Sequence, residues 1–397
     1  MEIKVIDQIM QEYLKNEEML GGALIVRKDD EIAYKNTWGY ADYERTKITD
    51  EENIYRMCSM TKPVIAVGIM MLQEQGKLNI QDPVKKFLPC FSDLKVLKQE
   101  DYEATLKMPE SKLEDTLKKL KENKLILEDL ERNITICDLL SHSSGIGQGP
   151  LGMFQMKGLK QNGTLEDWVN ELSTVVLDFQ PGKGTGYSPI AGFDILGRII
   201  EIVSKDSLES FCQKKIFNIL EMQDTGFHIS DKNREKLVTL CRRENGKLIK
   251  VSDGEGLNGV IERPGYVSGS AGLFSTIKDY EHFTRMLCNY GIFCGKKILK
   301  KETVELLGKV VPGIAAENIP GLEWGLGVII RTNPKLLGNC VTSGTYGWSG
   351  AYGTHFFISP KDNLECVFVT NRDDLNGAES YISRKVEELV FGIYANK

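Results

Sequence analysis

The chain has 397 residues, of which 41% are hydrophobic and 27% are charged. This length is enough to bury one large core or two modest ones, so an ordinary globular protein is expected. The formal net charge of −6 and the lack of a long basic run argue against a general nucleic-acid-binding protein. Small molecules are therefore the expected partners.

The cysteines, histidines and apolar runs narrow the class further. Nine cysteines without a Cys-x-x-Cys pair fit free thiols in a reducing compartment better than a disulfide or zinc framework. The four histidines lack a metal-ligand spacing such as His-Glu-x-x-His, so no metal site is expected. Because the first residues form no apolar run of signal-peptide length, and no stretch of about 18 apolar residues follows, the sequence predicts a cytoplasmic protein without a membrane span.

The N-terminal region begins with a predicted helix and a hairpin. Residues 5–14 have the pattern of a short amphipathic helix, and two apolar runs at 23–26 and 32–34 flank a charged turn, which predicts a β-hairpin. A long apolar helix starts after Ser59 and runs to 75–77, where a glycine and a lysine are typical of a helix C-terminus.

A serine and a lysine lie three residues apart at the start of that long helix. Residues i and i+3 share a helix face, so the amine of Lys62 is expected within hydrogen-bond reach of the hydroxyl of Ser59. The positive end of the helix favours a neutral lysine and a developing alkoxide or oxyanion. The same Ser-x-x-Lys pattern recurs at 92–95 and 275–278, where a solvated surface is the favoured interpretation, so context must select the functional pair.

The middle of the chain is predicted to be mainly helical. The highly charged stretch at 104–133 is interpreted as solvated helix and loop, and 134–145 as a short buried helix that runs into a turn. The glycine-rich loop at 181–186 lacks the Gly-Lys-Ser/Thr ending and the preceding strand of a P-loop. This loop instead presents Tyr187 and opens a helix with apolar residues at helical spacing up to Val203.

The last third is rich in predicted strands, at 325–330, 355–358 and 366–369, and a final helix is expected to begin near Ala378. Strands at both ends of the chain with helices between them suggest one sheet domain built from the two termini and an inserted helical region. We place the sheet domain at residues 1–80 and 258–397, and the helical domain at 81–257.

Several segments, in order along the chain, form a specific set of motifs. They are Tyr55-Arg56-Met57-Cys58-Ser59-Met60-Thr61-Lys62-Pro63, Ile134 to Gly145, Tyr187-Ser188 followed by Phe193-Asp194-Ile195-Leu196-Gly197, Ser268 to Thr276, and Trp348-Ser349-Gly350-Ala351. Together they resemble the serine β-lactamase and penicillin-binding protein superfamily, in its branch of class C β-lactamases, DD-peptidases and family VIII carboxylesterases. The resemblance covers nearly the whole chain.

The resemblance implies an α+β fold of the β-lactamase/DD-peptidase type, in which an antiparallel sheet is flanked by helices and carries an inserted helical domain. It also implies a serine hydrolase that forms an acyl-enzyme on small esters or amides without a cofactor. Ser59 is then the nucleophile, Lys62 accepts or relays its proton, and Tyr187 passes a proton to the leaving group and helps to activate water. The backbone N–H groups of Ser59 and Ala351 form the expected oxyanion hole, and Gly350 lets the strand approach closely.

Two departures from the family pattern bear on the substrate. Class C β-lactamases have Tyr-x-Asn as the second motif, whereas the third position here is Pro189. Their third motif is Lys-Thr-Gly, and Trp348, Ser349 and Gly350 replace it here, as in family VIII esterases. Both changes weaken the case for a β-lactam or D-Ala-D-Ala substrate. Arg372 is a candidate substitute cation for a substrate carboxylate, although an ordinary residue at a strand end is the favoured interpretation.

Several alternatives remain open at this point. Trp348 is either the wall of an acyl pocket or an ordinary core residue. Cys58 and His142 suggest a thiol hydrolase, but Cys58 is better interpreted as a small buried hydrophobic residue. A β-lactamase, a DD-peptidase, an acyltransferase and a non-catalytic binding module on the same fold are the rival functions, and lactams join esters and amides as possible substrates. The sequence decides neither the oligomeric state nor which of Lys62 and Tyr187 is the base.

Overall fold

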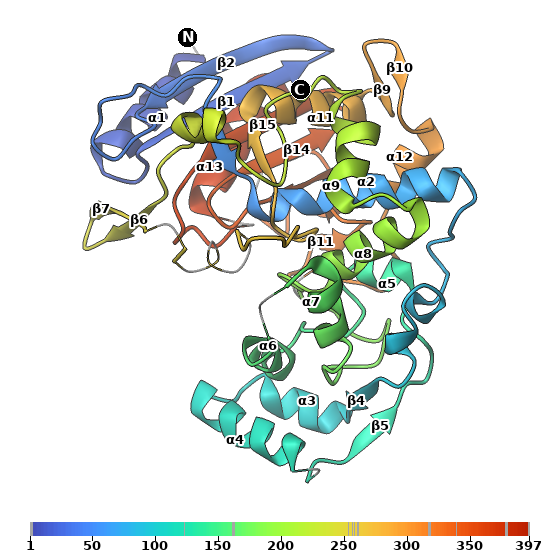
Figure 1. Cartoon of the computed structure of the whole chain (residues 1–397). Helices are drawn as coiled ribbons and strands as arrows, with labels where there is room; N and C mark the ends of the chain where they lie inside the picture. The colour runs from blue at the N-terminus through green and yellow to red at the C-terminus, as the bar shows by residue number, and fades with distance from the viewer. Residues whose placement is uncertain are drawn as a thin grey trace.

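The structure, a computed structural model, describes residues 3–122, 124–160, 163–252, 254, 255, 257, 259, 262–316, 319–338, 340–377 and 380–395. Within these residues the centre is a seven-stranded antiparallel sheet (Figure 1). The strands lie in the order β11 (Leu322–Trp324), β12 (Ile329–Arg331), β13 (Thr345–Ser349), β14 (His355–Ser359), β15 (Leu364–Thr370), β1 (Gly21–Lys28) and β2 (Glu31–Gly39).

The predicted N-terminal hairpin is confirmed as β1 and β2, which pair in antiparallel register. The turn between them consists of Asp29 and Asp30, whose φ angles are 52° and 64°. Positive φ at both central residues is the signature of the turn that matches the right-handed twist of two strands, and aspartate tolerates this conformation better than most residues. Strand β1 then continues the sheet by pairing with β15 from the other end of the chain.

Alternating side chains of the sheet enter two separate cores. Leu24 and Val26 pack with α1 (Ile3–Lys15) and α13 (Tyr381–Tyr394), which cover one face. Ala23 and Ile25 face the larger core on the other side, which includes α2 (Thr61–Glu74) and α11 (Ile277–Cys288). Because successive residues of a strand point to opposite faces, the near-continuous apolar run of β1 fits a strand buried on both sides.

The remaining helices lie mainly beyond α2, away from the sheet (Figure 1). They are α3 (Gln99–Thr105), α4 (Glu110–Lys121), α5 (Ile136–Leu140), α6 (Pro150–Lys157), α7 (Leu165–Leu172), α8 (Gly192–Ser204), α9 (Leu208–Cys212) and α12 (Lys301–Leu307). The short paired strands are β3 (Ile54–Arg56) with β8 (Phe274–Thr276), β4 (Lys95–Leu97) with β5 (Leu127–Asp129), β6 (Cys241–Glu244) with β7 (Lys247–Lys250), and β9 (Ile292–Phe293) with β10 (Lys296–Lys297). Helix α8 packs on α2, α5 and α7, and so connects the helical region to the sheet.

Most predicted elements are confirmed, with corrected ends. The helix expected at 5–14 is α1, the apolar helix after Ser59 is α2, and the strands expected at 355–358 and 366–369 are β14 and β15. The helix that follows the glycine-rich loop is α8. The final helix, α13, has Ser380 as its N-cap, whereas Ala378, where we expected it to begin, lies outside the described residues.

Two predictions need correction. Only the end of the strand expected at 325–330 is extended, because 325–328 form the turn between β11 and β12, and Gly327 has a left-handed φ of 80° that a regular strand does not contain. The second correction is partial, because the stretch at 104–133 is mostly exposed helix and loop, as predicted, but also contains the short strand β5 and a few buried residues. Helix α4 buries Leu113 in a small core with Leu97 and Leu151, because the leucines of this helix recur at helical spacing on one face.

The chain ends and the middle contribute differently to the fold. Strands of the main sheet come only from residues 21–39 and 322–370 of the described chain, in line with a sheet assembled from both termini. The proposed division at 80/81 and 257/258 remains a prediction, and Asn258 lies outside the described residues.

All nine cysteines are free, and four of them are buried. None of the described helices is both long and apolar enough to span a membrane.

Candidate active site

Ser59 lies in a single turn of 3₁₀-helix, Cys58–Met60, directly before α2. Two contacts hold this turn: the hydroxyl of Thr61 donates to the carbonyl of Cys58 at 2.6 Å, and the Thr61 hydroxyl oxygen accepts the N–H of Leu273 at 3.0 Å. Cys58 has a left-handed φ of 48°, which marks a sharp change of chain direction between β3 and the serine. Ser59 is buried, with 8% of its surface exposed.

The amine of Lys62 is fully buried and has three oxygen neighbours. Its Nζ lies 3.3 Å from the Oγ of Ser59, 2.8 Å from the carbonyl oxygen of Pro189 and 2.9 Å from that of Ser270. The predicted proximity of Ser59 and Lys62 is therefore present. The two carbonyls come from the loop before α8 and from the loop before β8, and the sequence motifs did not indicate either of them.

Burial lowers the pKa of Lys62 to about 7, although the negative charge of Asp194 acts in the opposite direction. A neutral amine has two N–H donors and one lone pair. If the carbonyls of Pro189 and Ser270 take the two N–H groups, the lone pair is left to face the hydroxyl of Ser59. This arrangement suits an amine that accepts the serine proton.

Tyr187 approaches Ser59 from the other side. Its phenolic O–H donates to the Oγ of Ser59 at 2.5 Å, and the Nζ of Lys62 lies 4.9 Å from the centre of its ring. Because the phenol donates to the serine oxygen, the serine proton is free to point toward Lys62. The geometry thus favours Lys62 over Tyr187 as the group that takes the proton from Ser59.

His142 contacts the segment that carries Tyr187 through a hydrogen bond and a ring contact. Its Nδ1 accepts the N–H of Ser188 at 3.2 Å, and its ring centre lies 5.0 Å from that of Tyr187. Burial, together with the charge of Lys62, holds the pKa of His142 well below its ordinary value, so the ring is neutral. Burial also raises the pKa of the Cys58 thiol to about 12. A neutral thiol and a structural histidine argue against the thiol-hydrolase alternative.

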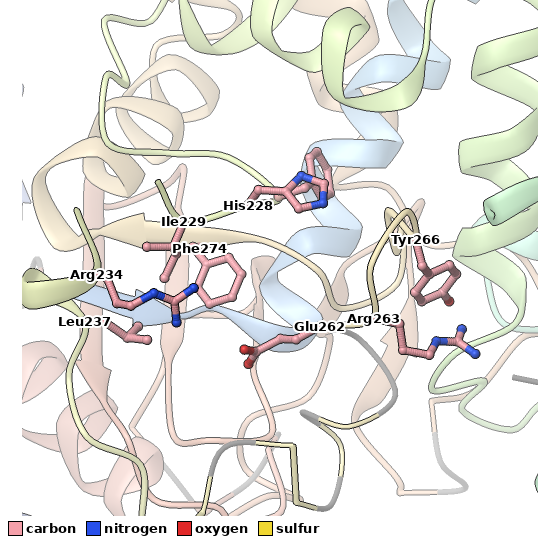
Figure 2. A pocket seen from close by; sticks show the side chains of 9 residues that line it. His228, Ile229, Arg234, Leu237, Glu262, Arg263, Tyr266 and Phe274 are labelled. Carbon is pink, nitrogen blue, oxygen red and sulfur yellow. The ribbon is translucent and has the colours of Figure 1, made fainter. Parts of the chain in front are cut away.

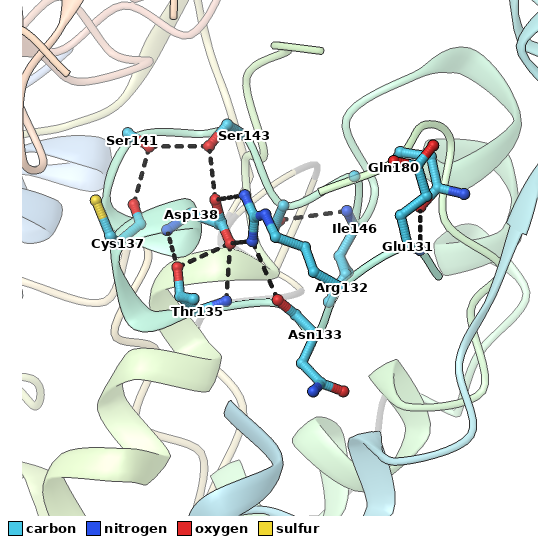
Figure 3. Close-up of polar contacts among 12 residues, drawn as sticks. Glu131, Arg132, Asn133, Thr135, Cys137, Asp138, Ser141, Ser143, Ile146 and Gln180 are labelled. Atoms are coloured by element: carbon cyan, nitrogen blue, oxygen red, sulfur yellow. Dashed lines mark hydrogen bonds and ion pairs between the residues drawn. The ribbon is translucent and has the colours of Figure 1, made fainter. Parts of the chain in front are cut away.

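The glycine-rich loop that precedes Tyr187 lies against the turn after α5, next to a polar network around Asp138 (Figure 3). Arg132 donates to both carboxylate oxygens of Asp138, at 2.6 and 2.8 Å, and Asp138 also completes the capping box with Thr135. A Cβ on Gly182 would lie 2.1 Å from the guanidinium of Arg132, and its N–H donates to the carbonyl of Ser143. Gly182 also has a left-handed φ of 77°, so the backbone conformation favours glycine at this position.

The turn after β13 touches the chain just before Ser59. A Cβ on Gly350 would lie 2.3 Å from the carbonyl oxygen of Met57, and the hydroxyl of Thr354 donates to that same oxygen at 3.1 Å. Within the described part of the chain, the N–H groups of Ser59 and Ala351 have no acceptor outside regular secondary structure. The oxyanion hole formed by these two N–H groups remains a prediction.

An aromatic cluster lines the side of the site next to Tyr187. The ring of Trp348 lies 5.2 Å from that of Tyr187 and 5.0 Å from that of Trp324, and Trp324 lies 4.3 Å from His142. Both tryptophans are buried. Trp348 belongs to the core and also contacts the ring of Tyr187, whereas its role as the wall of an acyl pocket remains a prediction. No sequence motif indicated that Trp324 lies beside the candidate site.

Two predicted site residues lie elsewhere. The hydroxyl of Ser349 lies 2.8 Å from Nδ1 of His355, on the opposite face of β13 from Trp348, because neighbouring strand residues alternate. Arg372 donates to the carbonyl of Glu18 at 2.6 Å and to the hydroxyl of Tyr381 at 3.0 Å, and it forms an ion pair with Asp374. Neither side chain is in a position to bind a substrate at Ser59, so Arg372 is a structural clamp rather than a carboxylate anchor.

The two other Ser-x-x-Lys matches lack the geometry of Ser59 and Lys62. Ser92 is exposed and Lys95 pairs with Asp129, as expected for a solvated surface. Ser275, in contrast, is buried and hydrogen-bonded to Thr225, so the surface interpretation is wrong for this serine.

A separate cavity of about 130 Å³ lies beside β8 and is lined by residues that include His228, Arg234, Glu262 and Tyr266 (Figure 2). Its lining contains none of the predicted site residues. Across the described residues, no cluster of three or more His, Cys, Asp or Glu side chains has the arrangement of a metal site.

A buried serine lies between a lysine amine and a phenol, an arrangement that suits a serine nucleophile for acyl transfer. The family model described as Beta-lactamase matches residues 6–390, so the chain belongs to the β-lactamase family. This match confirms the resemblance drawn from the motifs.

Individual proteins agree with this assignment. Esterase EstB of Burkholderia gladioli is 24% identical over 389 residues, which cover 92% of this chain and 89% of EstB. Lovastatin esterase of Penicillium rubens is 28% identical over 375 residues, or 87% of each chain. The solved structure of EstCE1, described as a hydrolase with promiscuous acyltransferase activity, superposes with a TM-score of 0.79 at 24% identity and covers 99% of this chain and 98% of its own. The predicted α+β fold class is confirmed.

Proposed function

We propose that this protein is an esterase that hydrolyses small, uncharged esters through an acyl-enzyme on Ser59. The broader class, an esterase-like serine hydrolase of the β-lactamase family, follows from the family match and from the esterases among its relatives. One observation carries the assignment of the residues: the Oγ of Ser59 lies between the Nζ of Lys62, at 3.3 Å, and the phenolic oxygen of Tyr187, at 2.5 Å.

Acylation uses these three residues in sequence. Ser59 Oγ attacks the ester carbonyl carbon as its proton passes to the neutral amine of Lys62. The negative charge that develops on the carbonyl oxygen is stabilised by the N–H groups of Ser59 and Ala351. When the tetrahedral intermediate collapses, the bond to the alcohol breaks, the leaving alkoxide takes the phenolic proton of Tyr187, and Tyr187 recovers a proton from the ammonium of Lys62.

Deacylation reverses the proton path. Water attacks the acyl carbon and its proton reaches Lys62 through the hydroxyl of Tyr187. Lys62 then returns that proton to the Oγ of Ser59 as the carboxylic acid leaves. The contacts of Ser59 Oγ with Lys62 Nζ and with the phenolic oxygen of Tyr187 support this path, and the transfer between Tyr187 and Lys62 is itself part of the proposal.

The substrate preference rests on what surrounds Ser59. A β-lactam or a D-Ala-D-Ala peptide carries a carboxylate, but Trp348 occupies the position of the family lysine and Arg372 is held by Glu18, Tyr381 and Asp374. An unpaired carboxylate in a buried site costs about 1–3 kcal/mol or more. The aromatic rings of Trp348 and Trp324 offer an apolar, uncharged surface instead.

A comparison of two substrate classes tests this proposal. We expect kcat/KM for nitrophenyl acetate or butyrate to exceed that for nitrocefin or benzylpenicillin by at least about tenfold, which corresponds to one missing polar partner. Intact-mass measurement should show the acyl group of the ester on wild-type protein and no added mass on Ser59→Ala. A nitrocefin kcat/KM equal to or above the best ester value would overturn the esterase assignment in favour of a β-lactamase.

Acyl transfer to an alcohol is a second candidate function. EstCE1, whose fold this chain shares, is described as a hydrolase with promiscuous acyltransferase activity. Ester formation when a short alcohol is added to the nitrophenyl butyrate assay would support transfer in addition to hydrolysis.

The cytoplasmic location remains part of the proposal, and the nine free thiols support it.

A further inference from the structure

We infer that Asp194 is a positioning residue for Lys62, because its carboxylate holds the Ser270 peptide whose carbonyl binds the Lys62 amine. This inference rests on the proposed role of Lys62 as the base. Asp194 lies in the first turn of α8 and has no exposed surface. The motif around Tyr187 contains this residue, but the sequence assigned no role to it.

All hydrogen bonds to Asp194 are donated to it. They come from the hydroxyl of Tyr266, from the hydroxyl of Ser268 at 3.0 Å and from the N–H of Ser270 at 2.8 Å. Tyr266 lies at the edge of the cavity shown in Figure 2. Hydrogen bonds from these three donors stabilise the ionised carboxylate, whereas burial acts against it and raises its pKa.

This buried charge lacks the usual compensation. In the described part of the chain no ion pair includes Asp194, and buried carboxylates are normally paired with a cation. Among the titratable groups that act on Lys62, Asp194 from α8 has the largest effect, and Cys58 from the turn before α2 is a neutral thiol. His142 and Tyr187 also face the amine, but His142 is neutral.

The loop that links Asp194 to Lys62 has little freedom to move. A Cβ on Gly269 would lie 2.5 Å from the carbonyl oxygen of Phe193, so residues 268–272 rest directly on the start of α8. The N–H of Ser270 is bound by Asp194, and its carbonyl accepts from Lys62 at 2.9 Å. A continuous series of contacts therefore connects Asp194, Ser270, Lys62 and Ser59.

This series determines where the lone pair of Lys62 points. The carbonyls of Pro189 and Ser270 take the two N–H groups of the neutral amine, which directs the lone pair to Ser59. If the Ser270 carbonyl moves, one N–H is released and the amine can rotate away from the serine. Asp194 thus acts on the reaction through position and through charge, and two substitutions separate these effects.

The first substitution is Asp194→Asn, which removes the charge and keeps the shape. Without a negative charge nearby the ammonium form of Lys62 is less favoured, so the acid limb of the kcat/KM–pH profile for nitrophenyl butyrate should move to lower pH by about half a unit or more. Ser268→Ala is the matched control for charge: it removes one donor to Asp194 and an acceptor for the N–H groups of Ser270 and Ala271, so kcat is free to fall, but the charge stays and the acid limb should not move.

The second substitution is Asp194→Glu, which keeps the charge and displaces the carboxylate by one methylene. We expect kcat to fall about tenfold or more because Ser270 is displaced, with KM little changed and the acid limb within about 0.2 pH units of wild type. This variant tests the positional effect if Asp194→Asn does not fold, as judged by its melting temperature.

The inference is wrong if the acid limb of Asp194→Asn coincides with that of wild type, if Ser268→Ala shifts it equally, or if Asp194→Glu retains full kcat. Labelling of wild-type Ser59 with a serine-directed phosphonate separates this failure from a failure of the proposed function. Labelling at Ser59 with no pH shift refutes only the role of Asp194, whereas no labelling refutes the acyl-enzyme itself and the role of Asp194 that depends on it.

Discussion

The contact between Gly350 and the chain before Ser59 makes a quantitative prediction for Gly350→Ala. The added Cβ would lie 2.3 Å from the carbonyl oxygen of Met57 and 2.2 Å from the hydroxyl oxygen of Thr354, whereas ordinary contact begins at 3.4 Å. The backbone oxygen of Met57 cannot rotate away as a flexible side chain can. The turn after β13 must therefore retreat from Ser59 by about 1 Å.

This displacement acts on the oxyanion hole because Ala351 follows Gly350 directly. Misplacing a group by about 1 Å costs roughly 10²-fold in rate, and losing one oxyanion donor costs about 10²- to 10³-fold in kcat. We therefore expect Gly350→Ala to lower kcat for nitrophenyl butyrate by about 10²-fold with a smaller change in KM. Overpacking at a buried position should also destabilise the fold by about 1–3 kcal/mol.

The matched control is Gly392→Ala in α13. A Cβ on Gly392 meets nothing within 4 Å, and alanine is a better helix former than glycine by about 1 kcal/mol. This variant should retain wild-type activity and melt at the same or a higher temperature. Both variants are assayed well below their melting temperatures, so that loss of folded protein does not imitate loss of catalysis. If folded Gly350→Ala retains more than a third of the wild-type kcat, the proposed role of this close approach is refuted.

Three further predictions follow from the site and its support. Burial lowers the pKa of Lys62 to about 7, and the base must be neutral to accept a proton. We therefore expect kcat/KM for a neutral ester to rise with pH through about 7 and then to level off. A profile that is flat from pH 5 to 9 would contradict this role. Ser59→Ala should abolish turnover and phosphonate labelling, whereas Cys58→Ala should change both very little. The reverse outcome in a mass-spectrometric labelling assay would reassign the nucleophile. Glu387→Gln removes the buried ion-pair partner of Arg331. We expect the free energy of unfolding, measured by urea titration, to fall by about 3 kcal/mol, and a loss below about 1 kcal/mol would show that this ion pair contributes little.

Local chemistry made much of the fold and the catalytic pair predictable. Ser59 and Lys62 are three residues apart on one helical turn, so their proximity depends on helix geometry alone. The hairpin β1–β2 follows from alternating strand residues and two aspartates that accept positive φ, and α8 follows from apolar residues at helical spacing.

The tertiary structure decided the features that depend on residues distant in sequence. The direction of the Lys62 lone pair depends on carbonyls 127 and 208 residues away, at Pro189 and Ser270, and a backbone carbonyl has no residue-type signature. Arg372 is a candidate cation by sequence, but its guanidinium donates to the backbone carbonyl of Glu18, from the other end of the chain. Ser349 points away from Ser59 because the pairing of β13 with β14 sets which face each residue occupies. Short-range geometry follows from neighbouring residues, whereas the neighbours of a buried polar group are set by how distant segments pack.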